Sequence, residues 1–168
     1  MRISSILAPS RVLLGLTGPS KRDVLARLAE PIVAARSCMD RSMLVEELVR
    51  REEQSSTAIA DGIAIPHARC EQGEHVTASF GIAPGGVDFD SLDGKPTRLV
   101  MVVVSPPSCP ELHVRWIAHV ARVLDDPATR ERLLRATNTA EVLATLDSRE
   151  HAIEAEDAAS SAAHGAHA

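Results

Sequence analysis

Apolar residues recur at helical spacing in two segments of the first third of the chain. The first segment follows Ser20, which with Asp23 three residues later resembles an N-terminal capping box with the shorter acid. The apolar stripe of this predicted helix comprises Val24, Leu25, Leu28 and Ile32. Pro31 lies within the stripe and is expected to kink or break the helix. A second helix is predicted after Asp40, a candidate N-cap, with a stripe formed by Met43, Leu44 and Leu48.

Three other segments favour β-strands: residues 11–16, 76–83 and 99–104. The last of them is apolar at every position. A strand in the middle of a sheet that is covered on both faces has this composition, so we expect residues 99–104 to be central. The sequence Asp93-Gly94-Lys95-Pro96 marks a turn before this strand.

Three prolines within residues 105–110 end the predicted central strand, and Pro110 suits the first position of a following helix. His113 would then lie in the first turn, at the head of a stripe formed by Ile117, Val120 and Leu124. Two more helices are expected, one over residues 128–134 and one capped by Thr139 and running through residues 142–146. Beyond Asp147 the chain is rich in Ala, Ser, Glu and His. We therefore expect one domain over residues 1–147 and a flexible, solvated tail over residues 148–168.

Length, charge and cysteine content narrow the possible classes of protein. A chain of 168 residues with 45% hydrophobic side chains is long enough for one domain with a substantial core. A net charge of -5 without a Lys/Arg block argues against a nucleic-acid partner. Residues 1–16 contain neither a signal peptide nor a membrane span, which indicates a soluble cytoplasmic protein without direct membrane insertion. The three widely spaced cysteines are expected to be reduced thiols: Cys38, Cys70 and Cys109.

One histidine, His67, directly follows a proline at the end of an apolar run. Pro66 fixes its own φ near −65° and biases Ile65 toward an extended conformation, so the backbone at His67 has few accessible states. A restrained neutral imidazole can attack phosphorus or a carbonyl carbon without the full entropic cost of ordering. The alternative is an extended segment that ends in a turn, with His67 merely exposed.

The residues around His67 decide between these alternatives. Residues 51–67 resemble, in register, the pattern R-E-x-x-x-S-T-x-I-x-x-G-I-A-I-P-H. This pattern is typical of the enzyme IIA components of the bacterial phosphoenolpyruvate-dependent phosphotransferase system, in the fructose/mannitol and nitrogen-regulatory class. The similarity continues through Val87-Asp88-Phe89, Asp93-Gly94, Pro106 and His113, and it covers about residues 3–146. The chain departs from the family at Ser55, where glycine is common, and at Ala68-Arg69, where many relatives have Gly-Lys.

The resemblance implies an α/β fold: a single domain in which helices pack on both sides of a mixed β-sheet of about five strands. It also implies a phosphotransferase in which Nε2 of His67 accepts phosphate from the histidine-containing phosphocarrier protein and passes it to a IIB acceptor. Arg51 and His113 match the arginine and second histidine of the family, and would bind the phosphoryl oxygens as N–H donors. Ser56 and Thr57 either contribute donors to the phosphate or stabilise the turn. No metal or organic cofactor is implied, and the spacing of His67, Cys70 and His75 matches no zinc motif.

A second interpretation assigns the same residues to a regulatory binding module. In that case phosphorylation of His67 changes the affinity for a partner protein and no acceptor is needed. The chain shows neither a IIB domain nor a membrane IIC segment, which mildly favours a free-standing regulatory type. The sequence specifies neither a sugar, nor the acceptor, nor an oligomeric state.

Overall fold

A computed structural model describes residues 1–35, 39–71 and 75–165. Two short 3₁₀ helices open the chain, η1 (Ile3–Ser5) and η2 (Pro9–Arg11). The strands are β1 (Val12–Leu14), β2 (Ile63–Ala64), β3 (His67–Arg69), β4 (Thr77–Val87) and β5 (Thr97–Ser105). The α-helices are α1 (Lys21–Ala34), α2 (Arg41–Gln54), α3 (Pro110–Leu124), α4 (Pro127–Arg135) and α5 (Thr139–Gly165).

The described residues form one mixed sheet of five strands. Its order is β1-β4-β5-β2. β3 also pairs with β5, on the same side as β2, so that β2 and β3 follow one another along one edge of β5. β4 and β5 are antiparallel, whereas β1 runs parallel to β4, and both β2 and β3 run parallel to β5. The predicted α/β fold, with a mixed sheet of about five strands and helices on both sides, is confirmed.

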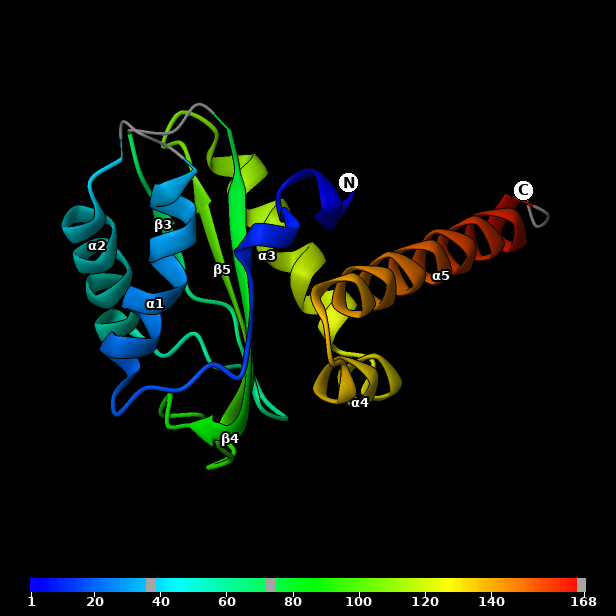
Figure 1. The fold of residues 1–168 in the computed structure, drawn as a ribbon. Helices are drawn as coiled ribbons and strands as arrows, with labels where there is room; N and C mark the ends of the chain where they lie inside the picture. Colours follow the sequence, from blue (N-terminus) through cyan, green and yellow to red (C-terminus); the bar gives the residue numbers. More distant parts are fainter. Residues whose placement is uncertain (36–38, 72–74, 166–168) are drawn as a thin grey trace.

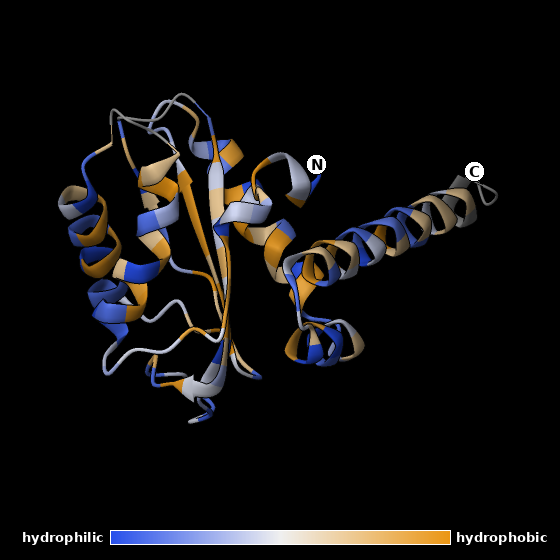
Figure 2. Cartoon of the chain, viewed as in Figure 1, coloured by the Kyte–Doolittle hydropathy of each residue, from blue (hydrophilic) through white to orange (hydrophobic). Residues whose placement is uncertain are grey.

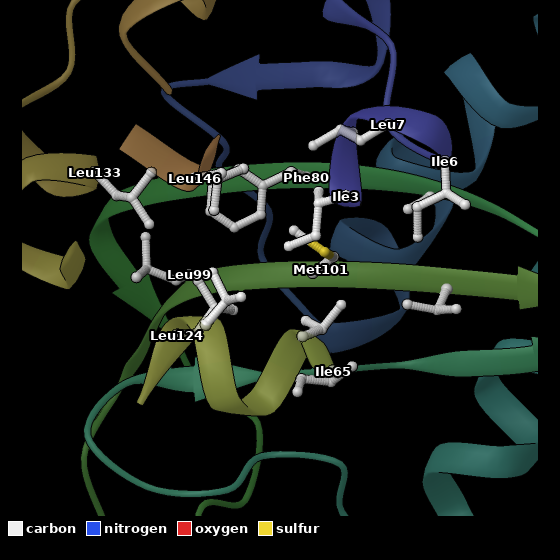
Figure 3. Close-up of a cluster of buried hydrophobic side chains, with 14 of the residues drawn as sticks. Ile3, Ile6, Leu7, Ile65, Phe80, Leu99, Met101, Leu124, Leu133 and Leu146 are labelled. Atoms are coloured by element: carbon white, nitrogen blue, oxygen red, sulfur yellow. The ribbon is translucent and has the colours of Figure 1, made fainter. Parts of the chain in front are cut away.

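Helices cover both faces of this sheet (Figure 1): α1 and α2 pack on one face, and α3, α4 and α5 lie on the other. β5 serves both layers, because successive side chains of a strand point to opposite faces. Leu99, Met101 and Val103 point into the core under α3 to α5, and the alternate valines point into the core under α1 and α2. β5 is therefore the central strand, as predicted. The first of the two cores also contains Phe80, Leu124 and Leu133 (Figure 3).

The predicted helix caps are confirmed at two of three sites. Ser20 accepts a hydrogen bond from the backbone N–H of Asp23, and Asp40 accepts one from Met43 at 2.9 Å. At α5 the cap is Asn138 rather than Thr139, because the Asn138 side chain accepts from the N–H of Glu141. Its amide oxygen takes the role that the sequence had assigned to the Thr139 hydroxyl.

Three sequence predictions differ in detail from the structure. α1 is not broken at Pro31 but continues to Ala34, because Pro31 lies in the last turn and the neighbouring Ile32 is fully buried. Met43 does not join the buried stripe of α2, and its side chain is 56% exposed. β4 continues beyond residue 83 to Val87, where a shift of register next to β5 accommodates Pro84 without a ladder hydrogen bond.

The largest difference lies at the C-terminal end, where the sequence predicts a flexible tail over residues 148–168. Helix α5 continues through this segment to Gly165, and its middle part packs against the N-terminal residues of the chain. Glu150 is buried and accepts a hydrogen bond at 2.8 Å from the N–H of Ile3, and Ile153 is buried in the core. The packed part therefore reaches beyond residue 147. Residues 154–162 are exposed, and Figure 1 shows this part of α5 leading away from the sheet.

Figure 2 shows the hydropathy of each residue along the chain: β5 is hydrophobic along its length, whereas hydrophobic and hydrophilic positions alternate along α1 and α2. None of the helices within the described ranges has the length and apolar character needed to cross a membrane. Cys70 and Cys109 are free thiols, and Cys38 lies outside the described residues.

Candidate functional site

His67 is the first residue of β3, and the backbone on both sides of it is fixed by hydrogen bonds. Val103 of β5 donates its N–H to the carbonyl of Pro66 at 2.9 Å, and His67 pairs with Val103 in the sheet. Before this point, the N–H of Ile65 donates to the carbonyl of Thr57 at 3.1 Å. The restrained conformation that Pro66 predicts is therefore supported by the sheet on one side and by the preceding loop on the other.

Both ring nitrogens of His67 have a partner. The Nε–H of Arg51 donates to Nε2 of His67 at 3.0 Å, so Nε2 must carry its lone pair. Nδ1 lies 2.9 Å from the carbonyl oxygen of Ile65, which accepts a hydrogen and thus assigns the proton to Nδ1. The network therefore selects the neutral tautomer in which Nδ1 carries the hydrogen and Nε2 carries the lone pair.

Arg51 lies in the last turn of α2, where its guanidinium does two things at once. Nη1 donates to the carbonyl of Ser55 at 2.9 Å and so stabilises the end of the helix, while Nε contacts His67. A planar guanidinium can make both contacts because its N–H groups have fixed relative directions.

His113 is placed in the first turn of α3, as the sequence predicts, and only 4% of it is exposed. Its ring lies edge-on to the His67 ring, with 5.2 Å between the ring centroids and 68° between the planes. Nδ1 of His113 is 2.5 Å from the hydroxyl of Ser105, the last residue of β5.

Burial and nearby positive charge keep both imidazoles neutral. Desolvation is the main cause that lowers the pKa of His113, to about 4, and the charges of His67, Arg69 and Arg51 act in the same direction. The pKa of His67 is also lowered, first by desolvation, although its hydrogen bond to Ile65 opposes this effect. At neutral pH the site thus combines two uncharged imidazoles with a permanent guanidinium charge.

A cavity of about 310 Å³ opens beside the two imidazoles. It is lined by Glu47, Arg50, Arg51, Gln54, His67, Ala68, Arg69 and His113. The structure therefore brings together the three residues that the sequence selected as catalytic: His67, His113 and Arg51. A cavity rich in N–H donors and positive charge suits a phosphoryl dianion.

Two further arginines line this cavity, Arg50 and Arg69, which were not among the site residues predicted from the sequence. Arg69 follows His67 by two residues on β3, so both side chains leave the same face of the strand. That spacing could have identified Arg69 once residues 67–69 were recognised as a strand. Arg50 carries no such signal, because it is one of several charged residues near the end of α2.

The structure does not bring Ser56 and Thr57 into the cavity. The Ser56 hydroxyl donates to the carbonyl of Phe89 at 2.5 Å, and the Thr57 hydroxyl donates to the buried carboxylate of Glu52 at 2.5 Å. The backbone N–H of Thr57 also donates to Glu52. Of the two roles that the sequence left open, the observed hydrogen bonds support stabilisation of the turn and not contact with phosphate.

Gly62, within the same motif, has a backbone role. Its φ is +77°, a conformation that L side chains rarely adopt, and a Cβ atom there would lie 3.2 Å from the carbonyl oxygen of Pro96. The Gly62 carbonyl accepts hydrogen bonds from Arg98 and Leu99 and thus connects the loop to β5.

Comparison with known proteins identifies the family. The sequence profile of the "Phosphoenolpyruvate-dependent sugar phosphotransferase system, EIIA 2" family matches residues 5–149. The chain belongs to this family. It is accordingly a phosphotransfer protein, a phosphohistidine carrier of the phosphotransferase system or of nitrogen regulation.

Three relatives illustrate the similarity. A nitrogen regulatory protein of Pseudomonas aeruginosa is 36% identical over 143 residues, which cover 85% of this chain and 92% of the relative. The crystal structure of the nitrogen regulatory protein IIA-Ntr from Neisseria meningitidis has a TM-score of 0.80 at 28% identity, covering 86% of this chain and 98% of that one. The Escherichia coli complex of enzyme IIA-Mtl with phosphorylated enzyme IIB-Mtl shares the fold, with a TM-score of 0.71 at 23% identity over 84% and 98% of the two chains.

Proposed function

We propose that Nε2 of His67 is the atom that carries the phosphoryl group. The observation that supports this assignment best is the pair of hydrogen bonds to the ring, from Arg51 to Nε2 and from Nδ1 to the carbonyl of Ile65. Together they leave a lone pair on Nε2 and direct a cation toward the same atom. That lone pair is the electron pair needed to form a bond to phosphorus.

In the proposed step, the phosphorus–nitrogen bond of a donor phosphohistidine breaks while a phosphorus–nitrogen bond to Nε2 of His67 forms. The donor ring, protonated on its other nitrogen, retains the electron pair of the broken bond and leaves as a neutral imidazole. The positive ring charge passes to His67, whose Nδ1 keeps its hydrogen, and the phosphoryl group keeps its charge throughout. Arg51 must then release Nε2 and donate to a phosphoryl oxygen instead. His113 donates an N–H from the opposite side, and both contacts would stabilise charge on the equatorial oxygens. No cofactor takes part in this transfer.

We infer that the donor is the histidine-containing phosphocarrier protein, acting in the cytoplasm, and that a IIB domain is one possible class of acceptor. The complex between IIA-Mtl and phosphorylated IIB-Mtl supports an acceptor of this class through a shared fold. The chain would then act as a phosphotransferase component, in which the protein itself is first acceptor and then donor.

A regulatory binding module is the second candidate function. The similarity to nitrogen regulatory proteins over 92% of the length of the Pseudomonas relative supports it. In this alternative the phosphoryl group on His67 changes the affinity for a regulated protein, and its onward transfer is not required.

The test is phosphorylation of the purified chain by phosphoenolpyruvate through the two general phosphotransferase proteins. We expect one acid-labile phosphate on the wild type and none on His67→Ala. His151→Ala is the matched control, because His151 is exposed on α5 and should not affect labelling. A labelled His67→Ala protein would refute the assignment of His67. Discharge of the phosphorylated wild type by a IIB domain would favour the carrier, whereas phosphorylation-dependent binding without discharge would favour the regulatory module.

A further inference from the structure

Ser105 contacts the second histidine of the site, although it does not itself line the cavity. It ends β5 and only 1% of it is exposed, and its Oγ atom lies 2.5 Å from Nδ1 of His113. The turn between β5 and α3 brings the two residues together, and the N–H of Cys109 donates to the carbonyl of Pro106 within it. The sequence motif that marks the site does not include Ser105.

The direction of this hydrogen bond decides what His113 can do. A neutral imidazole has one N–H and one lone pair, so the group on Nδ1 fixes the group on Nε2. If Ser105 donates to Nδ1, the hydrogen of His113 is on Nε2. If Ser105 accepts instead, Nε2 carries a lone pair, which would repel a phosphoryl oxygen.

The surroundings of Ser105 favour the first direction. Among the described residues, Nδ1 of His113 is the one acceptor within hydrogen-bond distance of the Ser105 hydroxyl. If the hydroxyl accepted from His113, its own hydrogen would be buried without a partner, which is unfavourable. The cavity also presents the guanidinium groups of Arg51 and Arg69, so it is suited to an anion that needs N–H donors.

We propose that Ser105 is a positioning residue: its hydroxyl donates to Nδ1 of His113 and thereby keeps the hydrogen of His113 on Nε2, available to the phosphoryl group on His67. This proposal rests on the proposed role of His67. It explains how a buried imidazole without charge can act as a hydrogen-bond donor. His113 then contributes a directed hydrogen bond to the phosphoryl group, while the positive charge of the site comes from arginine.

The first test is the ¹⁵N NMR spectrum of the imidazoles in the unphosphorylated protein. We expect the wild type to show His113 with a hydrogen on Nε2 and a lone pair on Nδ1. In Ser105→Ala the Nδ1–H tautomer should increase, and in Ser105→Thr, which retains a hydroxyl, the wild-type tautomer should return. Ser79→Ala is the matched control, because Ser79 is a fully buried serine on β4 that donates to the carbonyl of Leu28.

The second test is the rate of phosphoryl acceptance by His67. We expect Ser105→Ala to slow it about tenfold, the effect of one lost hydrogen bond, and Ser79→Ala to leave it close to the wild-type rate. A wild type with the hydrogen on Nδ1, or a Ser105→Ala protein with unchanged tautomer and rate, would overturn the proposal. The tautomer is measured without phosphate, so the wild-type spectrum remains decisive even if Ser105→Ala fails to fold. Absence of labelling on the wild type would instead refute the role of His67.

Discussion

The two faces of the sheet each supply one group to His67, and the two groups differ in kind. From the α2 face comes Arg51, a permanently charged side chain that reaches across the end of its helix. From the α3 face comes His113, a buried imidazole that is neutral at pH 7 because desolvation lowers its pKa. A positive charge at Nε2 of His67 and a neutral imidazole beside the His67 ring thus come from separate layers of the fold.

Each group is also held in a different way. On the α2 face, the buried carboxylate of Glu52 accepts from the backbone and hydroxyl of Thr57 and from Lys21 at 3.2 Å, which fixes the loop that leads to His67. On the α3 face, one hydroxyl, that of Ser105, contacts the imidazole directly. The loop on the α2 side is thus held by several hydrogen bonds to one carboxylate, whereas a single hydroxyl contacts the imidazole of His113.

The largest expected effect comes from removing the charged side. Arg51→Ala should slow phosphoryl transfer to His67 by about 10²–10³-fold, the usual effect of losing one preorganised donor to a developing charge. Arg51→Lys should recover only part of the rate, because a lysine cannot contact a ring nitrogen and a carbonyl with the same fixed geometry. Rapid-quench measurement of labelling by the phosphorylated donor protein gives these rates.

The control for this comparison is Arg22→Ala. Arg22 forms an exposed ion pair with Glu46 between α1 and α2 and lies outside the cavity, so its loss should not change transfer. An Arg51→Lys protein as fast as the wild type would show that charge alone suffices. The fixed geometry of the Arg51 guanidinium would then not contribute to transfer.

A smaller effect is expected from Glu52→Gln, which preserves size and removes the charge that the loop depends on. Glu52 is 5% exposed and accepts hydrogen bonds from Thr57 and Lys21. We expect the free energy of unfolding to fall by about 1–3 kcal/mol, as measured by urea denaturation, since hydrogen bonds to a buried charged group are lost or weakened. Glu53→Gln, at the neighbouring exposed position, should change it by less than about 0.5 kcal/mol. Equal stability of the wild type and Glu52→Gln would rule out a supporting role for this carboxylate.

Much of this arrangement follows from the sequence because it is local. Pro66 before His67, Pro110 at the start of α3 and Asp40 at the start of α2 each act on the backbone within a few residues. Their consequences could therefore be predicted without knowledge of the fold. The motif in residues 51–67 added Arg51, and the similarity that continues beyond it added His113, both through resemblance to the family.

Other features depend on packing between segments and have no local signal in the sequence. Ser105 and His113 meet because the turn after β5 reverses the chain, and no periodic pattern encodes that contact. The continuation of α5 beyond residue 147 is another example. Its composition resembles that of a solvated tail, but the contact between Glu150 and the N-terminal residue Ile3 joins two ends of the chain that are 147 positions apart.

The last test uses pH, rather than a substitution, to change the charge of His113. The pKa of His113 is about 4 in the folded protein and its ordinary value is 6.5, so between these pH values the unfolded chain binds a proton that the folded one does not. Acidification through this window therefore lowers stability, by at most about 1.4 kcal/mol for each pH unit. The lowered pKa of His67 acts in the same direction.

Comparison with His113→Gln isolates the contribution of His113 from those of His67 and the carboxylates. Urea denaturation of both proteins at several pH values between 7.5 and 4 gives the difference in their free energies of unfolding. We expect the advantage of the wild type to be constant above about pH 7 and to decline steadily from pH 6.5 toward pH 4. A constant difference across the window would mean that His113 titrates alike in the folded and unfolded states. His113 could then not be described as the neutral group of the site, because acid would protonate it as readily as a histidine in water.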